Sequence, residues 1–128
     1  MSGDRIATDT APRVLGPYAQ AVVAGGLVFC AGQVGIDPAT GKLVPGGIAA
    51  EAARAIANLR AVLTAAGLGL ADVVKTTVYV VDLGEFAALN EVYGRSFPAP
   101  YPARSTVQVA ALPAGARVEI DAIAARTR

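Results

Sequence analysis

Residues 48–66 carry apolar side chains along one side of a helix, and this pattern constrains the fold more than any other feature of the sequence. The apolar positions recur at intervals of three and four residues: Ile48, Ala52, Ile56, Leu59 and Leu63. Gly67 stands where such a helix would end. Because a helix that is apolar on one side buries that side against another element, we expect this helix to lie on a β-sheet.

Segments before and after this helix predict the strands of that sheet. Residues 19–36 indicate two short strands joined at Gly25 and Gly26, the second ending near Gly32, and residues 37–42 are typical of a turn. Residues 73–81 alternate between the two faces of a further strand. One face carries Val74, Thr76, Val78 and Val80, and the other carries Lys75, Thr77 and Tyr79.

A second helix is predicted to begin at Asp82 and to reach about Phe97. Asp82 is an N-cap residue, and Glu85 three positions later forms a variant of the capping box. Pro98 ends the helix. Two strands follow at about 104–112 and 117–125, and the short turn between them predicts that they pair as a hairpin.

The resulting order of elements, β-β-α-β-α-β-β, predicts an α+β sandwich with both helices on one face of a mixed sheet. The 128 residues suffice for one domain and are too few for two. The other face of the sheet must also be covered, and only association with another chain can provide this second layer. With 54% hydrophobic and 16% charged residues the composition agrees with subunit contacts, although abundant alanine explains it equally well.

Missing residue types exclude several classes of chemistry. The chain has no histidine and one cysteine, Cys30, which removes Ser-His-Asp and Cys-His nucleophiles, Cys/His zinc sites and internal disulfides. The glycine-rich phosphate-binding motifs GxGxxG and GxxxxGKS/T are absent as well. Carboxylates, tyrosines, two lysines and water remain for proton transfer. Cys30 itself lies in an apolar segment, where an inert role is expected.

Charge and hydropathy indicate the kind of partner and the compartment. Eleven basic and ten acidic residues give a net charge of +1, and the arginines form no cluster, so no nucleic-acid partner is expected. The longest uncharged stretch, residues 14–36, is interrupted by proline, glutamine and glycines, and residues 1–12 lack the layout of a secretory signal. We therefore expect a cytoplasmic protein without a membrane partner.

Polar side chains lie on one face of each of the last two strands. Arg104, Thr106 and Gln108 share a face of the first, while Glu119 and Asp121 lie opposite the apolar face of the second. One interpretation is that Arg104 grips a small carboxylate through two parallel N–H···O bonds while a carboxylate handles water or a proton. The other is a solvated face with ordinary cross-strand ion pairs.

The spacing of Arg104 and Glu119 restricts the first interpretation. In a tight hairpin that turns near residues 114 and 115, Glu119 pairs with about Ala110 and lies roughly 20 Å along the strands from Arg104. Either a bulge bends the strands, or the two residues of one site come from different chains. Glu119 and Asp121 would raise each other's pKa if both face a sheltered site.

Asn90 and Tyr18 have two interpretations each. Asn90 falls within an aromatic stripe on the second helix: Phe86, Asn90, Tyr93 and Phe97. Its amide is either satisfied by backbone groups in the core or part of a pocket. Tyr18 follows Gly16 and Pro17, and it is either a packed aromatic or a hydroxyl aimed at a ligand.

Six segments of the chain together resemble one known family. They are GPYAQAV (16–22), CAGQVGIDPATG (30–41), NLRAVLTAAG (58–67), DVVKTTVYVVDL (72–83), YPARSTVQVAALP (101–113) and VEIDAIA (118–124). In this order and without large gaps they are similar to the Rid family, also called YjgF, of reactive intermediate deaminases. The resemblance covers nearly the whole chain, so we expect residues 1–128 to form a single Rid/YjgF-like domain.

The resemblance implies a fold, an assembly and an activity. The fold would be a chorismate-mutase-like α+β sheet with two helices on one face, assembled as a barrel-like homotrimer with ligand sites between subunits. The activity would be hydrolytic deamination of 2-imino acids, such as 2-iminopropanoate and 2-iminobutanoate, to 2-keto acids and ammonia. The resemblance implies neither a metal nor an organic cofactor.

Position by position, the resemblance also implies site residues. Arg104 matches the carboxylate-binding arginine of the family and Glu119 its water-positioning glutamate. Tyr18, Gly32 and Asn90 match pocket residues. In the hydrolysis that the resemblance implies, Arg104 would fix the substrate carboxylate and Glu119 would orient a water molecule toward the imine carbon. Backbone N–H groups near Ala31 and Gly32 would steady the departing amine.

Two pocket positions depart from the family pattern. Ala31 stands where typical deaminases have serine, and Thr106 stands where many have cysteine. Thr106 can still form hydrogen bonds, whereas Ala31 offers only backbone groups to a substrate. These departures favour an alternative function, a non-catalytic or chaperone-like protein that binds small carboxylic or keto acids. RNA cleavage, described for other members, finds little support in a near-neutral chain without histidine.

Overall fold

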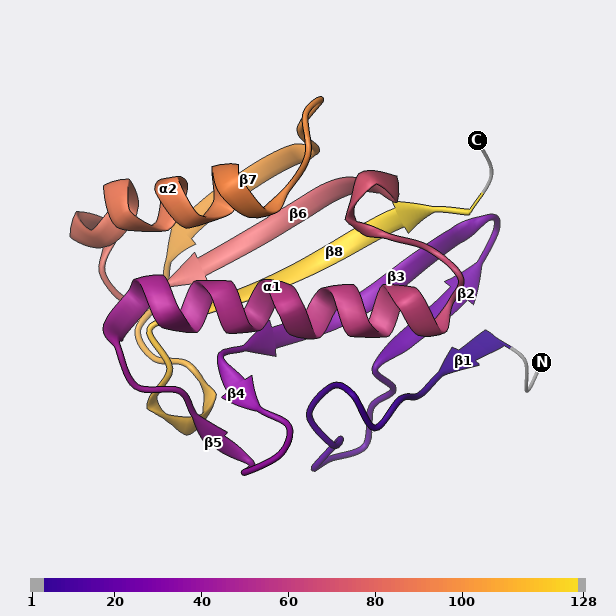
Figure 1. Cartoon of the computed structure of the whole chain (residues 1–128), viewed down its shortest axis with the longest axis horizontal. Coiled ribbons are helices and arrows are strands. Elements are labelled where there is room, and N and C mark those ends of the chain that lie inside the picture. The colour runs from indigo at the N-terminus through magenta and orange to yellow at the C-terminus, as the bar shows by residue number, and fades with distance from the viewer. Residues whose placement is uncertain (1–3, 127–128) are drawn as a thin grey trace.

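The computed structural model describes residues 4–126, in which six strands form one mixed sheet and both helices cover one face of it (Figure 1). The strand order is β1-β2-β3-β8-β6-β7. The strands are β1 (Arg5–Ile6), β2 (Ala21–Ala24), β3 (Leu27–Val34), β6 (Val73–Val80), β7 (Ala103–Gln108) and β8 (Val118–Ala125). A separate ribbon pairs β4 (Ile36–Asp37) with β5 (Lys42–Leu43), and the helices are α1 (Gly47–Ala65) and α2 (Phe86–Ser96). The predicted α+β arrangement is thus confirmed.

The helix predicted from the apolar period is α1, and its apolar side forms the centre of the core. All five residues that defined the period are buried, and they pack toward β3 and β8. The helix ends as expected at Gly67, which has a positive φ of 79°. The Gly67 N–H donates to the Thr64 carbonyl and the Leu68 N–H donates to the Leu63 carbonyl, the hydrogen-bond pattern of a Schellman motif.

Replacing Leu59 with alanine should lower the free energy of unfolding by about 2–5 kcal/mol, because the side chain is fully buried and its removal leaves a cavity. The exposed Thr64 on the same helix provides the matched control. Thr64→Ala should change the stability by no more than about 0.5 kcal/mol. Urea unfolding followed by circular dichroism measures both, and equal midpoints for the two variants would contradict the assigned core.

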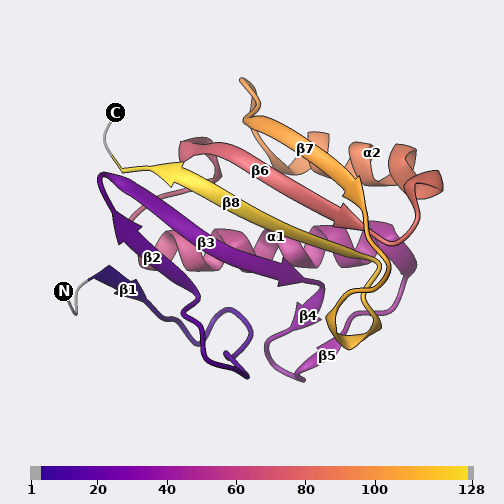
Figure 2. The same cartoon turned by 180° about the vertical axis from the view of Figure 1, so that it is seen from behind.

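The predicted hairpin between the last two strands is wrong. β7 pairs in parallel with β6, while β8 lies between β6 and β3 and is antiparallel to both (Figure 2). Parallel neighbours need a crossover connection, which α2 provides between β6 and β7. β8 takes the central place because every second residue is buried: Val118, Ile120, Ala122 and Ala124. No residue of β7 is fully buried, which suits an edge strand.

The predicted faces of β6 are confirmed except at one end. Thr76, Val78 and Val80 are buried beneath the helices as expected. Val74 is 47% exposed, because an irregularity in the β6–β8 ladder between Val73 and Lys75 turns Val73 inward instead. The other face of β6 carries Lys75, Thr77 and Tyr79, as predicted.

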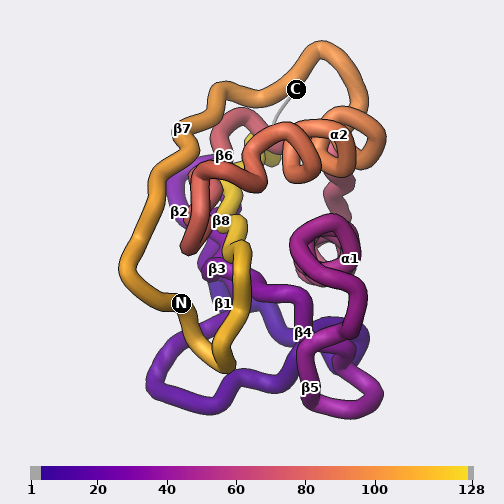
Figure 3. Tube along the Cα trace, turned by 90° about the vertical axis from the view of Figure 1, so that its left-hand side faces the viewer, coloured from indigo at the N-terminus to yellow at the C-terminus, as the bar shows by residue number. Residues whose placement is uncertain are grey.

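The second face of the sheet is open in residues 4–126. Viewed edge-on, the molecule has two layers, with the sheet on one side and the helices on the other (Figure 3). The open face carries apolar residues, including Phe29 and Val107, each 41% exposed. In this part of the chain neither helix has the length and apolar character needed to span a bilayer.

Candidate functional site

Arg104 lies on the helix-covered side of the edge strand β7. It pairs in register with the buried Thr76 of β6, and its guanidinium carbon lies 4.7 Å from the ring centroid of Tyr93 and 5.5 Å from that of Phe86. Both aromatic residues belong to α2. Within residues 4–126 Arg104 forms no ion pair, so the interpretation as a cross-strand ion pair does not describe it.

A hollow of about 330 Å³ opens beside Arg104. Its lining consists of Asn90, Tyr93, Gly94, Tyr101, Pro102 and Arg104. The Oδ1 atom of Asn90 is buried and has no hydrogen-bond partner in the described chain, and the same holds for the Oγ1 atom of Thr106, which follows Arg104 on the same face of β7. Backbone groups therefore do not satisfy the Asn90 oxygen, which favours the pocket interpretation of this residue.

Glu119 lies on the opposite, open side of the sheet. It is in register with Val34 on β3 and with Tyr79 on β6, and it alternates with the buried Val118 and Ile120. Its carboxylate packs directly on Gly32, where an added Cβ would overlap Oε2 and come within 2.8 Å of the carboxyl carbon. A side chain at this position would therefore displace the Glu119 carboxylate from its place.

Ala31 and Gly32 lie where the β3–β8 ladder is irregular, between Cys30 and Gln33. The Ala31 N–H donates to the Gln20 carbonyl at 2.9 Å. This hydrogen bond occupies the Ala31 N–H, so this group is not available to steady a departing amine, whereas the same role for an N–H near Gly32 stays a prediction. Ala31 is not among the residues that line the hollows beside Arg104 and Glu119, and its side chain carries no polar group in place of the serine of typical family members.

The environment of Glu119 shifts its proton affinity. Burial raises the pKa of the Glu119 carboxyl above its ordinary value, and the nearby charge of Asp121 raises it further. Asp121 itself accepts hydrogen bonds from the Tyr79 hydroxyl at 3.0 Å and from the Thr77 N–H at 3.2 Å. The predicted effect of Asp121 on Glu119 is thus confirmed, although burial is the larger cause.

Cys30 has the inert character that the sequence indicates. It is a free, buried thiol. Burial and, to a smaller extent, the charge of Asp121 raise the pKa of Cys30 to about 12. The reactive thiolate is therefore disfavoured at neutral pH.

Tyr18 shares a second hollow, of about 260 Å³, with Gly32 and Glu119. Tyr18 is 56% exposed, so it does not pack in the core of its own chain. The turn that contains Pro113 and Ala114 forms another wall of this hollow.

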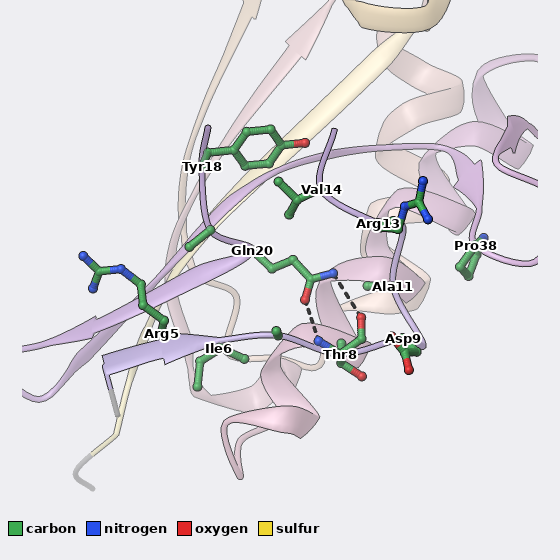
Figure 4. Close-up of a pocket in the computed structure, with 12 residues that line it drawn as sticks. Arg5, Ile6, Thr8, Asp9, Ala11, Arg13, Val14, Tyr18, Gln20 and Pro38 are labelled. Carbon is green, nitrogen blue, oxygen red and sulfur yellow. Dashed lines mark hydrogen bonds between the residues drawn. The ribbon is translucent and has the colours of Figure 1, made fainter. Parts of the chain in front are cut away.

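The loop that leads to Tyr18 is held by the side chain of Gln20. The Gln20 side-chain amide accepts a hydrogen bond from the Thr8 N–H at 2.7 Å and donates to the Thr8 carbonyl (Figure 4). It also donates to the Pro12 carbonyl at 3.0 Å. These bonds connect residues 8–12 to the start of β2, so the chain preceding Tyr18 has a defined path beside an adjoining hollow of about 610 Å³.

Arg104 and Glu119 do not meet within one chain. The former lies on the helix side of the edge strand, the latter on the open side of β8, and β6 separates the two strands. The bulge in β3 and β8 does not bring them together. Each chain therefore carries two separate groups of candidate residues, which we call half-sites. The Arg104 half-site comprises Arg104, Asn90, Thr106 and the aromatic residues of α2, and the Glu119 half-site comprises Glu119, Tyr18 and Gly32.

Sequence reasoning missed the aromatic residues that surround Arg104. The aromatic stripe on the second helix marks the setting of Asn90, but no pattern in the sequence indicates that the rings of Phe86 and Tyr93 contact the guanidinium. Tyr101 and Pro102, which line the same hollow, precede Arg104 in the YPAR segment. The closeness of Tyr101 and Pro102 to Arg104 in the sequence is the one feature that could have indicated their place in this hollow.

Replacing Gly32 with alanine should lower the kcat of any reaction that uses the Glu119 carboxylate by about tenfold or more, because the new methyl group displaces this carboxylate from its place. Gly69→Ala is the matched control, since a Cβ at Gly69 meets no atom within 4 Å. Steady-state kinetics on purified, folded proteins measures the effect. Equal kcat values for Gly32→Ala and wild type would show that the carboxylate position does not matter.

The fold and the two half-sites define a small α+β protein in which, over residues 4–126, an arginine without an ion pair and a carboxylate of raised pKa each lie beside a surface hollow. Residues 8–126 match the family model described as Endoribonuclease L-PSP, and the chain belongs to this family, the YjgF/Rid family. The expectation from the sequence segments is thereby confirmed.

Known proteins similar to this chain cover almost all of it. Protein DfrA of Myxococcus xanthus is 52% identical over 97% of this chain and 96% of its own. A 2-iminobutanoate/2-iminopropanoate deaminase of Capra hircus is 50% identical over 93% of this chain and 87% of its own. The crystal structure of E. coli TdcF with bound serine superposes with a TM-score of 0.91 at 43% identity, covering 96% of this chain and 98% of TdcF.

Proposed function

We propose that the protein is a hydrolase that deaminates 2-imino acids such as 2-iminopropanoate and 2-iminobutanoate to 2-keto acids and ammonia. The observation that carries this proposal is the Arg104 guanidinium, which has aromatic neighbours and no carboxylate partner in residues 4–126, so its N–H donors are free for a substrate carboxylate. The 50% identity to a deaminase of such imino acids supports the same substrate class.

The proposed active unit is a homotrimer with its sites between subunits. Arg104 and Glu119 lie on opposite sides of the sheet, so a site that uses both needs a second copy of the chain. The open face with exposed Phe29 and Val107 offers an apolar surface for such an assembly. In this arrangement the Arg104 half-site of one chain completes the Glu119 half-site of its neighbour.

The proposed mechanism follows from the chemistry of the two half-sites. Arg104 holds the substrate carboxylate through two parallel hydrogen bonds, and Asn90, Thr106 and Tyr18 bind the rest of the small ligand. Glu119, with its raised pKa, accepts a proton from a water molecule as the water oxygen bonds to the imine carbon. Return of that proton to nitrogen gives a carbinolamine, which carries a hydroxyl and an amino group on the same carbon. Glu119 then transfers the hydroxyl proton to the amino nitrogen as the C–N bond breaks, which releases ammonia and leaves the keto group.

The protein needs to accelerate the hydrolysis only modestly, because the imine already reacts with water in solution. The substrate and products differ by one water molecule and one ammonia, so no oxidant or reductant enters the reaction, and neither a metal nor an organic cofactor is proposed. Side chains that could hold a metal ion do not cluster in residues 4–126. The only partners proposed are the small acid and further copies of the chain, with no nucleic acid and no membrane. The cytoplasmic location stays a prediction.

The test is hydrolysis of an imino acid generated in situ by an amino-acid oxidase, with keto acid and ammonia measured as products. The purified protein should accelerate product formation from both 2-iminopropanoate and 2-iminobutanoate above the rate in buffer. No acceleration with either imino acid would refute the proposed function.

Ala31 favours one alternative, a protein that binds small carboxylic or keto acids without catalysis. Its side chain has no polar group, and its N–H is already bound to the Gln20 carbonyl. Calorimetric binding of a keto acid together with no turnover of either imino acid would select this alternative.

A further inference from the structure

The aromatic contacts of Arg104 differ from the usual way in which proteins compensate an arginine. A carboxylate partner would neutralise the guanidinium and occupy its N–H donors. The rings of Tyr93 and Phe86 instead lie against the guanidinium at 4.7 and 5.5 Å, where the negative ring face attracts the cation without accepting a conventional hydrogen bond. The two rings stand seven residues apart on α2, so they project from the same side of the helix.

The Tyr93 ring is held firmly in this position. Tyr93 is only 4% exposed, and its ring lies 4.5 Å from the ring of Phe97. Its hydroxyl shares a buried hydrogen bond of 2.7 Å with the Thr76 hydroxyl. Thr76 in turn is the residue of β6 that stands in register with Arg104. The strand that places Arg104 therefore also fixes the ring beneath its guanidinium.

We propose that Tyr93, fixed by Thr76, is a positioning residue that holds the Arg104 guanidinium open for a carboxylate ligand. The inference rests on the proposed function in one respect only, that Arg104 binds the carboxylate of the ligand. Phe86 has a smaller share in this role, because it is more exposed and farther from the guanidinium.

Calorimetric titration with 2-ketobutyrate, the stable product, tests the inference without any turnover. Tyr93→Leu removes the ring and should weaken binding about tenfold, since a partly desolvated cation–π contact contributes about 1–2 kcal/mol. Tyr93→Phe keeps the ring and should weaken binding by no more than about threefold, an upper limit for loss of a modest hydrogen bond. The uncharged amide of the same keto acid should bind equally to wild type and Tyr93→Leu.

Kinetics separates positioning from a general structural role. Tyr93→Leu should raise KM about tenfold while kcat at saturation stays within about twofold, because the ring acts on carboxylate binding and not on the water. A residue that only supports the core would lower Tm without this selective change in KM. If Tyr93→Leu does not fold, Phe86→Leu replaces it, with an expected loss of about threefold in keto-acid affinity.

The outcomes distinguish the two proposals. Keto-acid binding that weakens about tenfold in Tyr93→Leu and by no more than about threefold in Tyr93→Phe, with no imine turnover in wild type, supports the positioning role and refutes the deaminase. Equal keto-acid affinity in wild type and a folded Tyr93→Leu, or in Phe86→Leu where that variant replaces it, overturns the positioning role even if imines are hydrolysed. A wild-type protein that binds no keto acid overturns the positioning role as well.

Discussion

Replacing Arg104 with alanine is expected to abolish most of the acceleration of 2-iminopropanoate hydrolysis while leaving the chain folded. Truncating one partner of a desolvated, hydrogen-bonded charge pair costs about 2–5 kcal/mol, which corresponds to a factor of roughly 30 to 5,000 in kcat/KM. The fold should persist, because Arg104 is half-buried on an edge strand and forms no ion pair within residues 4–126. Product formation by the variant, followed beside its thermal unfolding, measures both effects.

Two variants control this experiment. Arg104→Lys keeps the positive charge but loses the planar pair of donors, so its kcat/KM should fall between those of wild type and Arg104→Ala. Arg95→Ala removes an exposed arginine of α2 whose pair with Glu91 is worth little, and it should behave as wild type. An Arg104→Ala protein with kcat/KM within about threefold of wild type would remove Arg104 from the site.

Replacing Glu119 with glutamine should have the second large effect, a fall in kcat by a factor of about 100 to 10,000, because the amide cannot accept the proton of the attacking water. The amide has nearly the same shape, so binding of 2-ketobutyrate should change little. Stopped assays of keto-acid release give kcat, and calorimetry gives the affinity. A Glu119→Gln protein that binds the keto acid and turns over at the wild-type rate would contradict the assigned role.

The pH dependence gives an independent test of Glu119. Its pKa is raised in the ligand-free chain, so the acidic limb of kcat/KM should lie above the ordinary range of a glutamate, and Asp121→Asn should move this limb to lower pH. Tyr79 and Gly32 are the other residues that face the carboxylate across the strands. An acidic limb that does not move in Asp121→Asn would show that Asp121 has no influence on the acting group.

The same raised pKa has a consequence for stability. The folded chain binds the Glu119 proton more tightly than the unfolded chain, so this group destabilises the fold as pH rises from its ordinary pKa through the raised one. Glu119→Gln should therefore have a Tm above that of wild type at neutral pH, and the difference should shrink below the ordinary glutamate pKa. A lower Tm of Glu119→Gln at neutral pH would contradict the direction of the shift.

Local periodicity predicted α1, both strand faces of β8 and most of β6, because helix and strand periods depend on neighbours in sequence. It failed for the pairing of β7 and β8. A short connection between two strands favours a hairpin, but the preceding β6-α2-β7 segment also satisfies the pattern of a parallel crossover unit. The pairing of a strand depends on how many of its residues are buried. That burial depends on how all strands and helices of the sheet pack together, which neighbouring residues in the sequence do not reveal.

The site could be predicted as a set of residues but not as an arrangement. Alternation and the family resemblance together indicated Arg104 and Glu119, whereas their placement on opposite sides of the sheet follows from the strand order. The contact of Gly32 with Glu119 depends on the register of β3 and β8 across an irregular ladder. Tyr93 contacts Arg104 only because a crossover helix covers the edge strand, and no local pattern reports such a contact.

A mixture of two inactive variants tests the central claim that one site takes Arg104 from one chain and Glu119 from another. Arg104→Ala and Glu119→Gln chains are unfolded together in equal amounts, refolded, and assayed with 2-iminopropanoate beside each variant refolded alone. If the residues come from different chains, random mixing restores both groups in about a quarter of the sites, and activity returns to about a quarter of wild type. If both residues act within one chain, every chain in the mixture lacks one of them, and no activity above that of the separate variants would contradict the account.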